Sequence, residues 1–374
     1  MKLLLSFIST MFLLAILLAG GGSAWFFYEY NKPGPLEEET LVNIPPGSSL
    51  DAISRRLSES GALEQPLLFK ITARLSGAGS SLKAGEYGFP PHITMAETLD
   101  MLRKGETFQR LVTVREGLTS FEIVRLLNET PNLTGEVTAT PPEGTLLPDT
   151  YSHQKDEPRA AVLARMAEAM KALRAELFKV SVPLPPAENG LEPPVVEDSG
   201  LAVLPEAVRQ LCGIAQDDTA PPVNTVSDEC WNQIVTLASI VEKETGHPEE
   251  RPRVAGVFLN RLERGIPLQT DPTVIYAITK GEHKNGGKGP LGRRLLTKDL
   301  EFDSPYNTYK YPGLPPGPIA NPGRASIMAV LNPEKHEFIY FVADGTGGHV
   351  FAKTLEEHNR NVAEWRKIRK ASGK

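Results

Sequence analysis

The sequence predicts an α+β fold: an N-terminal transmembrane helix, a small α+β domain, and a larger α+β domain with a helical core and a β-hairpin. Three observations lead to this prediction. The chain begins with a long uncharged apolar run, a strand-turn-helix pattern then repeats, and amphipathic helices followed by an alternating hairpin pattern close the chain. A chain of 374 residues also exceeds the usual size of one compact core.

The first predicted element is the apolar run from Leu3 to Tyr28, which contains no charged residue. At about 1.5 Å per helical residue, it is long enough to cross a bilayer. Lys2 precedes it and acidic residues follow, a bias that places the N-terminus in the cytoplasm. A cleaved signal peptide is the alternative, because Gly22-Ser23-Ala24 is a passable cleavage site. Both alternatives export the rest of the protein, and we expect residues 1–30 to be a retained anchor.

A strand-turn-helix unit then occurs three times, the middle copy being the loosest. The copies span residues 42–57, 87–102 and 112–127. In each copy Ser48, Thr94 or Thr119 stands three residues before an acidic residue, which is the spacing of a helix capping box. The pattern over residues 31–110 resembles the LysM-like modules of cell-wall proteins, which bind glycan chains. Glycan binding and a plain spacer role remain equally open for this domain.

The second predicted domain, residues 111–374, contains an insertion of different composition at about 181–229. The insertion has eight prolines, nine acidic residues and a single basic residue, Arg209. This composition predicts a solvated, poorly ordered segment rather than part of a core. Cys212 and Cys230 would lie in an oxidising compartment that could join them in a disulfide, and two unpaired thiols are the alternative.

Composition and charge exclude some classes of function. The net charge of −6 provides no basic surface for nucleic acid, and the seven His residues show no metal-ligand spacing. We therefore expect no nucleic-acid partner, no metal and no cofactor.

The stretch "LASIVEKETG" (237–246) places two carboxylates, Glu242 and Glu244, in an apolar run typical of a buried helix. Burial disfavours the charged form of a carboxyl group, so its pKa rises toward the range useful for proton transfer near neutral pH. Both acids could equally well be structural and pair with Lys243, Arg251 or Arg253. On the helical wheel the two acids flank the main apolar stripe at similar angles, so helical spacing alone does not choose between them.

Three long motifs follow this helix. They are "RVAGVFLNRLERGIPLQTDPTVIYAI" (253–278), "SPYNTYKYPGLPPGPIANPG" (304–323) and "YFVADGTGGHVFAKTLEEHN" (340–359). With "LPDTY" and the apolar N-terminus, they closely resemble the MltG (YceG-like) family of endolytic murein transglycosylases, membrane-anchored enzymes that cut the glycan strands of bacterial peptidoglycan. The resemblance covers nearly the whole chain except the acidic insertion.

The resemblance implies one catalytic residue. In this family the catalytic acid is the Glu directly before Thr in "EKET", which is Glu244 here, and Thr245 supplies the small hydroxyl group that follows it. Glu242 is then a structural neighbour. The single carboxyl would protonate the glycosidic oxygen of N-acetylmuramic acid (MurNAc) and then deprotonate the 6-hydroxyl of the same sugar. The product would be a 1,6-anhydro-MurNAc end, formed without water.

The resemblance also implies a location and partners. The enzyme would sit in the cell inner membrane as a single-pass protein with a cytoplasmic N-terminus and its bulk in the periplasm. It would bind peptidoglycan glycan strands and terminate nascent strands near the membrane, with peptidoglycan synthases as candidate protein partners.

Polar and aromatic residues in the later loops are suited to a sugar-binding cleft, with turn formation as their alternative role. They are Gln269, Thr270, Tyr306, Asn307, Tyr309 and Asn321. Asp271 is expected to be structural because Asp before Pro favours a turn or cap. His349 opens the second strand of the predicted hairpin and is also expected to be structural. Two rival functions are a muramidase that uses water and a non-enzymatic wall-binding scaffold.

Overall fold

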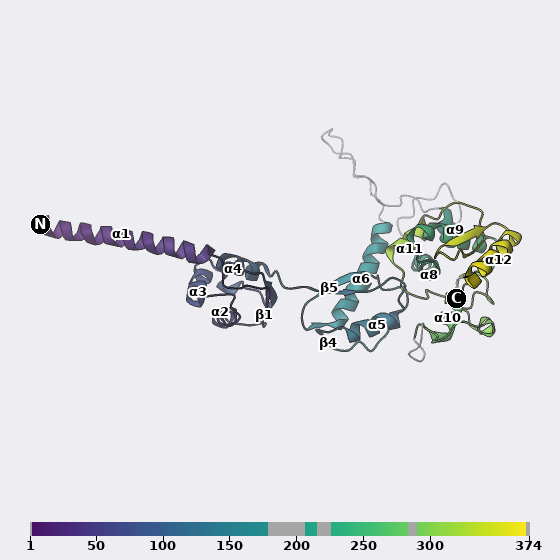
Figure 1. Ribbon diagram of the computed structural model, residues 1–374, viewed down its shortest axis with the longest axis horizontal. Helices are drawn as coiled ribbons and strands as arrows, with labels where there is room; N and C mark the ends of the chain where they lie inside the picture. The colour runs from purple at the N-terminus through teal and green to yellow at the C-terminus, as the bar shows by residue number, and fades with distance from the viewer. Residues whose placement is uncertain (1, 179–205, 215–225, 283–289, 372–374) are drawn as a thin grey trace, which may run out of the picture. The chain divides into compact units, whose positions relative to one another are not determined.

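The computed structural model describes residues 2–178, 206–214, 226–282 and 290–371, which form two compact units (Figure 1). Unit 1 comprises Met1–Leu111 and Ser152–Glu157, and unit 2 comprises Val112–Tyr151 and Pro158–Lys374. All sheets among the described residues are two-stranded, with the pairings β1-β2, β3-β5, β4-β6 and β7-β8. The fold is thus mixed, and helices make up most of it, as the sequence predicts.

Unit 1 begins with the long apolar helix α1 (Lys2–Asn31). Its segment Ser6–Asn31 is long and apolar enough to cross a membrane, by length and composition. The last turns of α1 belong to the folded unit, because Phe26 and Tyr30 pack against its core and against each other, with ring centroids 5.9 Å apart.

The rest of unit 1 is a small α+β core. β1 (Thr40–Ile44) pairs antiparallel with β2 (Gly85–Phe89), so that Thr40 faces Phe89 and Ile44 faces Gly85. The helices are α2 (Leu50–Glu59), α3 (Pro66–Leu75), the 3-10 turn η1 (Ala78–Ser80) and α4 (Met95–Lys104). Fully buried Phe69, Tyr87 and Phe89 fill the space between sheet and helices.

The predicted strand-turn-helix units are confirmed, with one correction to their caps. Thr94 and Thr119 each cap a helix through a complete capping box with the Glu three residues later. The prediction that Ser48 caps α2 is wrong, because Ser49 accepts the bond from Ala52 N. The Ser48 hydroxyl instead donates to the carbonyl of Pro45, 2.7 Å away, inside the preceding turn.

The remaining helices belong to unit 2, and so do the remaining strands, except that β3, β5 and β6 each contain residues of both units. In order they are β3 (Arg110–Thr113), α5 (Ser120–Glu129), β4 (Leu133–Thr134), β5 (Thr150–His153), β6 (Glu157–Pro158), α6 (Arg159–Leu177), α7 (Glu206–Leu211), α8 (Asp228–Glu244), η2 (Pro248–Glu250), α9 (Arg251–Glu263), α10 (Asp271–Thr279), η3 (Thr297–Glu301), α11 (Arg324–Leu331), β7 (Tyr340–Ala343), β8 (His349–Ala352) and α12 (Leu355–Ala371).

Helix α8 forms the centre of unit 2. Every residue from Ile234 to Val241 is buried, because α9 and α11 both pack against it. The predicted hairpin is confirmed: β7 and β8 pair antiparallel, with Tyr340 opposite Ala352 and Ala343 opposite His349. The terminal helix α12 packs against this hairpin.

One part of the proline-rich insertion differs from the prediction. The expectation of a solvated segment is wrong for residues 206–214, because Val208 of α7 is fully buried in the core of unit 2. The predicted disulfide between Cys212 and Cys230 is confirmed, and it ties the end of α7 to the start of α8. The rest of the insertion up to residue 225 lies outside the described residues.

The disulfide should contribute measurably to the stability of unit 2. Replacing both Cys212 and Cys230 by Ser should lower the free energy of unfolding by about 3 kcal/mol, because a cross-link over a loop of this length restricts the unfolded chain. Urea unfolding measures this. As a control, a reducing agent should lower the stability of the unsubstituted protein to a similar extent and leave the double variant unchanged. Equal stability of the two proteins would contradict the expectation.

Candidate active site

The last residue of α8, Glu244, is presented where a buried helix ends. Ser227 caps the start of this helix by accepting a hydrogen bond from Cys230 N, 3.1 Å away. At the other end Thr245 adopts an extended conformation, with φ −127° and ψ 133°, and turns the chain away. The side chain of Glu244 is half-buried and lines a cavity of about 530 Å³.

Several elements of unit 2 build this cavity around Glu244. The wall is formed by parts of α9, the loop before α10, the first residue of α10, strand β7 and helix α12. The lining residues are Glu244, Phe258, Arg261, Leu268, Gln269, Thr270, Asp271, Tyr309, Tyr340, Phe341, Val342, Leu355 and His358. The cavity thus combines two carboxyl groups, one guanidinium group and several aromatic faces, a composition suited to binding a sugar and transferring a proton.

Glu242 has a different environment, although it is only two residues away. Its side chain is 5% exposed, and its carboxylate accepts a hydrogen bond from Arg251 Nη2 at 2.9 Å and one from Gly323 N at 3.0 Å. Arg251 also binds Glu116 at 2.9 Å. A Cβ at position 323 would lie 1.9 Å from the Glu116 carboxylate, so a larger residue there would displace the Glu116 side chain. Glu242 therefore joins α8 to α9 and to the loop before α11.

Glu244 has no such partner, and its carboxyl makes no hydrogen bond to any described residue. Burial raises the pKa of Glu244 from 4.5 to about 8, and the negative charge of Asp271 in the same cavity adds to the rise. Asp271 itself accepts a hydrogen bond from the Tyr309 hydroxyl, 2.8 Å away. The two carboxyl groups of the cavity thus differ: Glu244 is protonated near neutral pH, and Asp271 is held by a donor.

Thr245 lies behind Glu244 rather than in the cavity. It is 3% exposed, and its hydroxyl donates to Glu250 at 3.1 Å and accepts from His247 N at 3.0 Å. Glu250 also binds both the backbone N–H and the imidazole of His349, at 2.9 and 2.8 Å. Burial alone would raise the pKa of Glu250, but the bonds from His349 and Thr245 hold it below its ordinary value. This chain of bonds fastens the end of α8 to the hairpin.

Gln269, Thr270 and Tyr309 are predicted site residues that the structure does bring to the cavity. Gln269 adopts a left-handed conformation with φ 54°, and its backbone N–H binds the carbonyl of Thr308 at 3.1 Å. The next N–H, of Thr270, binds the Thr308 hydroxyl at 3.1 Å. The Thr270 side-chain hydroxyl is buried without a hydrogen-bond partner among the described residues.

Tyr306, Asn307 and Asn321 do not line the cavity. The ring of Tyr306 packs against Tyr276, with centroids 5.0 Å apart. The side chain of Asn307 is fully buried, donates to two backbone carbonyls of its own loop and accepts from Tyr309 N at 3.0 Å. These contacts make Asn307 a support for Tyr309.

Asn321 occupies the centre of another buried network. Its amide oxygen accepts from Leu146 N at 3.1 Å, and its amide nitrogen donates to Glu143 and to the Ser120 hydroxyl, at 3.1 and 3.0 Å. Burial raises the pKa of Glu143 to about 7, against the lowering effect of its bonds to Ser120. Asn321 thus connects three distant segments of unit 2 and is not exposed to the cavity.

Arg261 lines the cavity although it is not among the predicted site residues. Its side chain is 7% exposed, donates to two backbone carbonyls and to Gln269 Oε1 at 2.7 Å, and forms no ion pair with any described residue. A signal was present, because Val254, Phe258 and Arg261 share one helical face and an Arg on a buried face is unusual. The aromatic residues of β7 could not be assigned to a cavity without the tertiary structure.

The arrangement is suited to acid-base chemistry. A protonated carboxyl that is free of internal hydrogen bonds can give its proton to a ligand and then take one back. No group of three or more His, Cys, Asp or Glu side chains that could hold a metal ion lies within the part of the chain that the structure describes.

Comparison with known proteins shows extensive similarity. The model of the YceG-like family matches residues 42–364. A Bacillus subtilis (strain 168) protein named endolytic murein transglycosylase is 32% identical over 351 residues, which are 92% of this chain and 90% of that protein. The Streptococcus pneumoniae (serotype 2, strain D39 / NCTC 7466) protein of the same name is 29% identical over 378 residues, 96% of this chain and 64% of that protein.

A solved structure is also similar. The crystal structure of a YceG-like protein from Listeria monocytogenes has 28% sequence identity and a TM-score of 0.44, and the match covers 86% of this chain and 99% of that one.

The different environments of the two acids predict opposite effects of the same substitution on stability. The raised pKa of Glu244 means that ionising it in the folded protein is unfavourable, so stability falls as pH rises from 4.5 to about 8. Glu244→Gln removes this cost and should raise the free energy of unfolding at pH 8.5 by about 1–3 kcal/mol. At pH 5 the gain should be much smaller. Urea unfolding at the two pH values measures both.

Glu242→Gln is the matched control for this prediction. It removes one charge of a buried ion pair with Arg251, so it should lower the free energy of unfolding by about 2 kcal/mol. If Glu244→Gln destabilises the protein at pH 8.5 as Glu242→Gln does, the description of Glu244 as an unpaired buried acid is wrong.

Proposed function

The chain belongs to the YceG-like family, and we propose that it is a membrane-anchored lytic transglycosylase that cuts peptidoglycan glycan strands internally. The observation that carries the proposal is the state of Glu244: a carboxyl that lines a cavity, has no hydrogen-bond partner among the described residues and has its pKa raised to about 8. The names of the related proteins support the same activity and the same substrate class.

In the proposed reaction, Glu244 acts twice. As an acid it protonates the oxygen that links C1 of MurNAc to the next sugar, and the C1–O bond breaks. As the resulting carboxylate it removes the proton from the 6-hydroxyl of the same MurNAc, whose oxygen bonds to C1. The 1,6-anhydro ring forms, the proton returns to Glu244, and no water is consumed. A raised pKa serves both steps, because the acid is present at neutral pH and its conjugate base is strong.

The cavity walls provide contacts for the sugar. Tyr309 and Tyr340 offer aromatic faces, and Gln269 offers an amide. Thr270 lies beside Gln269 in the same wall, and the bond from its backbone N–H to the Thr308 hydroxyl, 3.1 Å long, positions this part of the wall. We assign a supporting role to the other predicted residues, Thr245, Tyr306, Asn307 and Asn321, because they hold the segments that form or adjoin the walls.

A hydrolytic muramidase is a second candidate, because Asp271 lies in the cavity with Glu244. Two-carboxylate glycosidases use the second group as a nucleophile or as a base for water. We favour the single-carboxyl mechanism because the Tyr309 hydroxyl already engages the Asp271 carboxylate, and because the charge of Asp271 raises the pKa of Glu244.

We further propose that α1 is a retained single-pass anchor in the inner membrane, with the N-terminus in the cytoplasm and both units in the periplasm. The uncharged span and the disulfide support this placement. An anchored enzyme would reach nascent strands near the membrane, where it could terminate their growth. Unit 1 would serve there as a LysM-like glycan-binding module or as a spacer.

The products formed from intact glycan strands test the reaction. The full-length protein in detergent should convert long strands to shorter ones that end in 1,6-anhydro-MurNAc, lighter by one water than reducing ends. Glu244→Gln should lower the rate by about 100-fold or more, because general acid-base catalysis contributes that much. Glu242→Gln, assayed below its unfolding temperature, should retain most activity. Reducing ends alone would support a muramidase, and equal activity of wild type and Glu244→Gln would reject the assigned acid.

The pH dependence of kcat/KM tests the role of Asp271. With wild-type protein, kcat/KM should fall as pH rises through about 8, because Glu244 loses its proton. Asp271→Asn removes a negative charge, lowers the pKa of Glu244 and should move this fall to lower pH. Asp303→Asn removes an exposed charge that does not line the cavity and should leave the profile unchanged. A loss of activity in Asp271→Asn as large as in Glu244→Gln would favour the two-carboxylate reaction.

A further inference from the structure

Helix α3 of unit 1 carries an apolar stripe that no described part of the protein covers. Leu67, Ile71 and Leu75 are 65%, 41% and 80% exposed. Their spacing of four residues puts them on one side of the helix. The opposite side is used for folding, because Leu68, Phe69, Thr72 and Ala73 are buried in the core of unit 1. The stripe is therefore a separate apolar surface and not an extension of the core.

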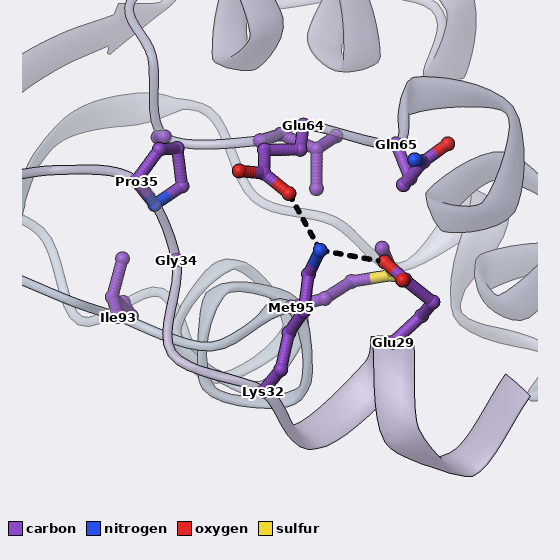
Figure 2. Close-up of a pocket in the computed structure, with 10 residues that line it drawn as sticks. Glu29, Lys32, Gly34, Pro35, Glu64, Gln65, Ile93 and Met95 are labelled. Atoms are coloured by element: carbon purple, nitrogen blue, oxygen red, sulfur yellow. Dashed lines mark ion pairs between the residues drawn. The ribbon is translucent and has the colours of Figure 1, made fainter. Parts of the chain in front are cut away.

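This helix begins next to the end of the apolar helix α1. Lys32, the residue after α1, forms ion pairs with Glu64 at 2.7 Å and with Glu29 at 2.9 Å (Figure 2). Glu64 stands two residues before the start of α3. The ion pairs with Glu64 and Glu29 raise the pKa of Lys32, so Lys32 stays charged and holds the two helices together. Figure 1 shows α3 on the side of unit 1 from which α1 extends.

The sequence of α1 indicates where the lipid surface would lie. The uncharged segment ends at Tyr28, and its last residues include Trp25, Phe27 and Tyr28, which are 53%, 70% and 65% exposed. Exposed Trp and Tyr at the end of a span are typical of the headgroup region of a bilayer. Lys32 follows four residues later, about 6 Å along the helix axis. The ion pair with Glu64 therefore puts the beginning of α3 at the level of the headgroups.

The charges beside the stripe suit an anionic lipid surface. Lys70 and Arg74 lie on α3 between the stripe residues in sequence, and α3 itself contains no acidic residue. Lys70 binds Asp51 at 2.8 Å, whereas the guanidinium group of Arg74 is exposed and forms no hydrogen bond or ion pair with any described residue. A short helix with an apolar side flanked by basic residues is a known form of interfacial membrane contact.

We propose that α3 docks on the surface of the bilayer that α1 spans, with Leu67, Ile71 and Leu75 inserted among the lipids. The inference rests on the proposed membrane anchor. Docking would give unit 1 a second attachment to the membrane, in addition to the span itself. A membrane-bound protein partner or a second copy of this chain is the competing occupant of the stripe.

The test uses the full-length protein in nanodiscs that contain phosphatidylethanolamine and phosphatidylglycerol. The two natural cysteines form a disulfide, so an introduced cysteine is the only thiol open to labelling. Three single-cysteine variants carry the same fluorophore: Ile71→Cys on the stripe, Arg55→Cys on the exposed side of α2, and Ile8→Cys within the span. Quenching by lipids with a nitroxide on the acyl chain is compared with quenching by aqueous iodide.

We expect the label at position 71 to be quenched by the lipid nitroxide at least twofold more than the label at position 55, and to be protected from iodide. Adding Leu67→Gln and Leu75→Gln should reverse both effects while thermal unfolding of the protein stays the same. Replacing the lipids by phosphatidylcholine should weaken the quenching at position 71, since the anionic charge is lost.

The label at position 8 reports the anchor independently. If lipid quenches position 8 but quenches position 71 no more than position 55, the docking proposal is wrong and the anchor stands. If neither position is quenched by lipid, both proposals are wrong. Protection of position 71 from both quenchers would show that protein covers the stripe, and this result would also overturn docking on lipid.

Discussion

The buried ion pair between Glu242 and Arg251 stabilises the end of α8, from which the candidate site is built. It joins the end of α8 to the start of α9, and the second carboxylate oxygen of Glu242 binds the loop before α11 through Gly323 N. A buried charge without a partner would be strongly destabilising. With Glu242 satisfied, the end of α8 is fixed to both α9 and the loop before α11. Glu244 is then presented without a partner at the last position of a helix whose end is held by its neighbours.

The lack of a partner is what suits Glu244 to the proposed role of acid and base. A carboxyl with internal donors would be ionised and stable, with little tendency to take up or release a proton near neutral pH. Glu244 instead combines burial with the nearby charge of Asp271, and both act in the same direction on its pKa. The folded protein tolerates this unfavourable environment because the surrounding contacts stabilise it. These contacts include the hydrogen bonds that join Thr245, Glu250 and His349. Stability and activity thus make opposite demands at this position.

Unit 1 is stabilised by the same kinds of interaction, namely apolar burial, helix caps and ion pairs. Its core is small, and the ends of its elements are fixed by the capping box at Thr94 and by the Lys32 ion pairs. The apolar stripe on α3 is the exception, because three large apolar side chains remain in contact with solvent. Next to a helix that can span a membrane, such a surface has an apolar environment within reach. The membrane would then orient unit 1 as well as retain it.

Local features of the chain were predictable from the sequence. The three strand-turn-helix units, the caps at Thr94 and Thr119, the hairpin and the pairing of Cys212 with Cys230 follow from spacing and composition, because these structures form between residues that are near in sequence. The burial of Val208 was not predicted. The acidic, proline-rich composition of the insertion indicated a solvated segment, and one short apolar segment within it was too weak a signal to predict a buried helix.

Only the tertiary structure separated the two acids by their contacts. Helical spacing put Glu242 and Glu244 in equivalent positions beside the apolar stripe. Their environments differ because Glu242 binds Gly323, which is 81 positions away in the sequence, and Arg251, which lies at the start of the next long helix. The same holds for Asn321, which looked like a loop residue of a cleft and instead joins segments up to 203 positions away. A side chain's pKa and role depend on which distant groups reach it, and a linear pattern does not contain that information.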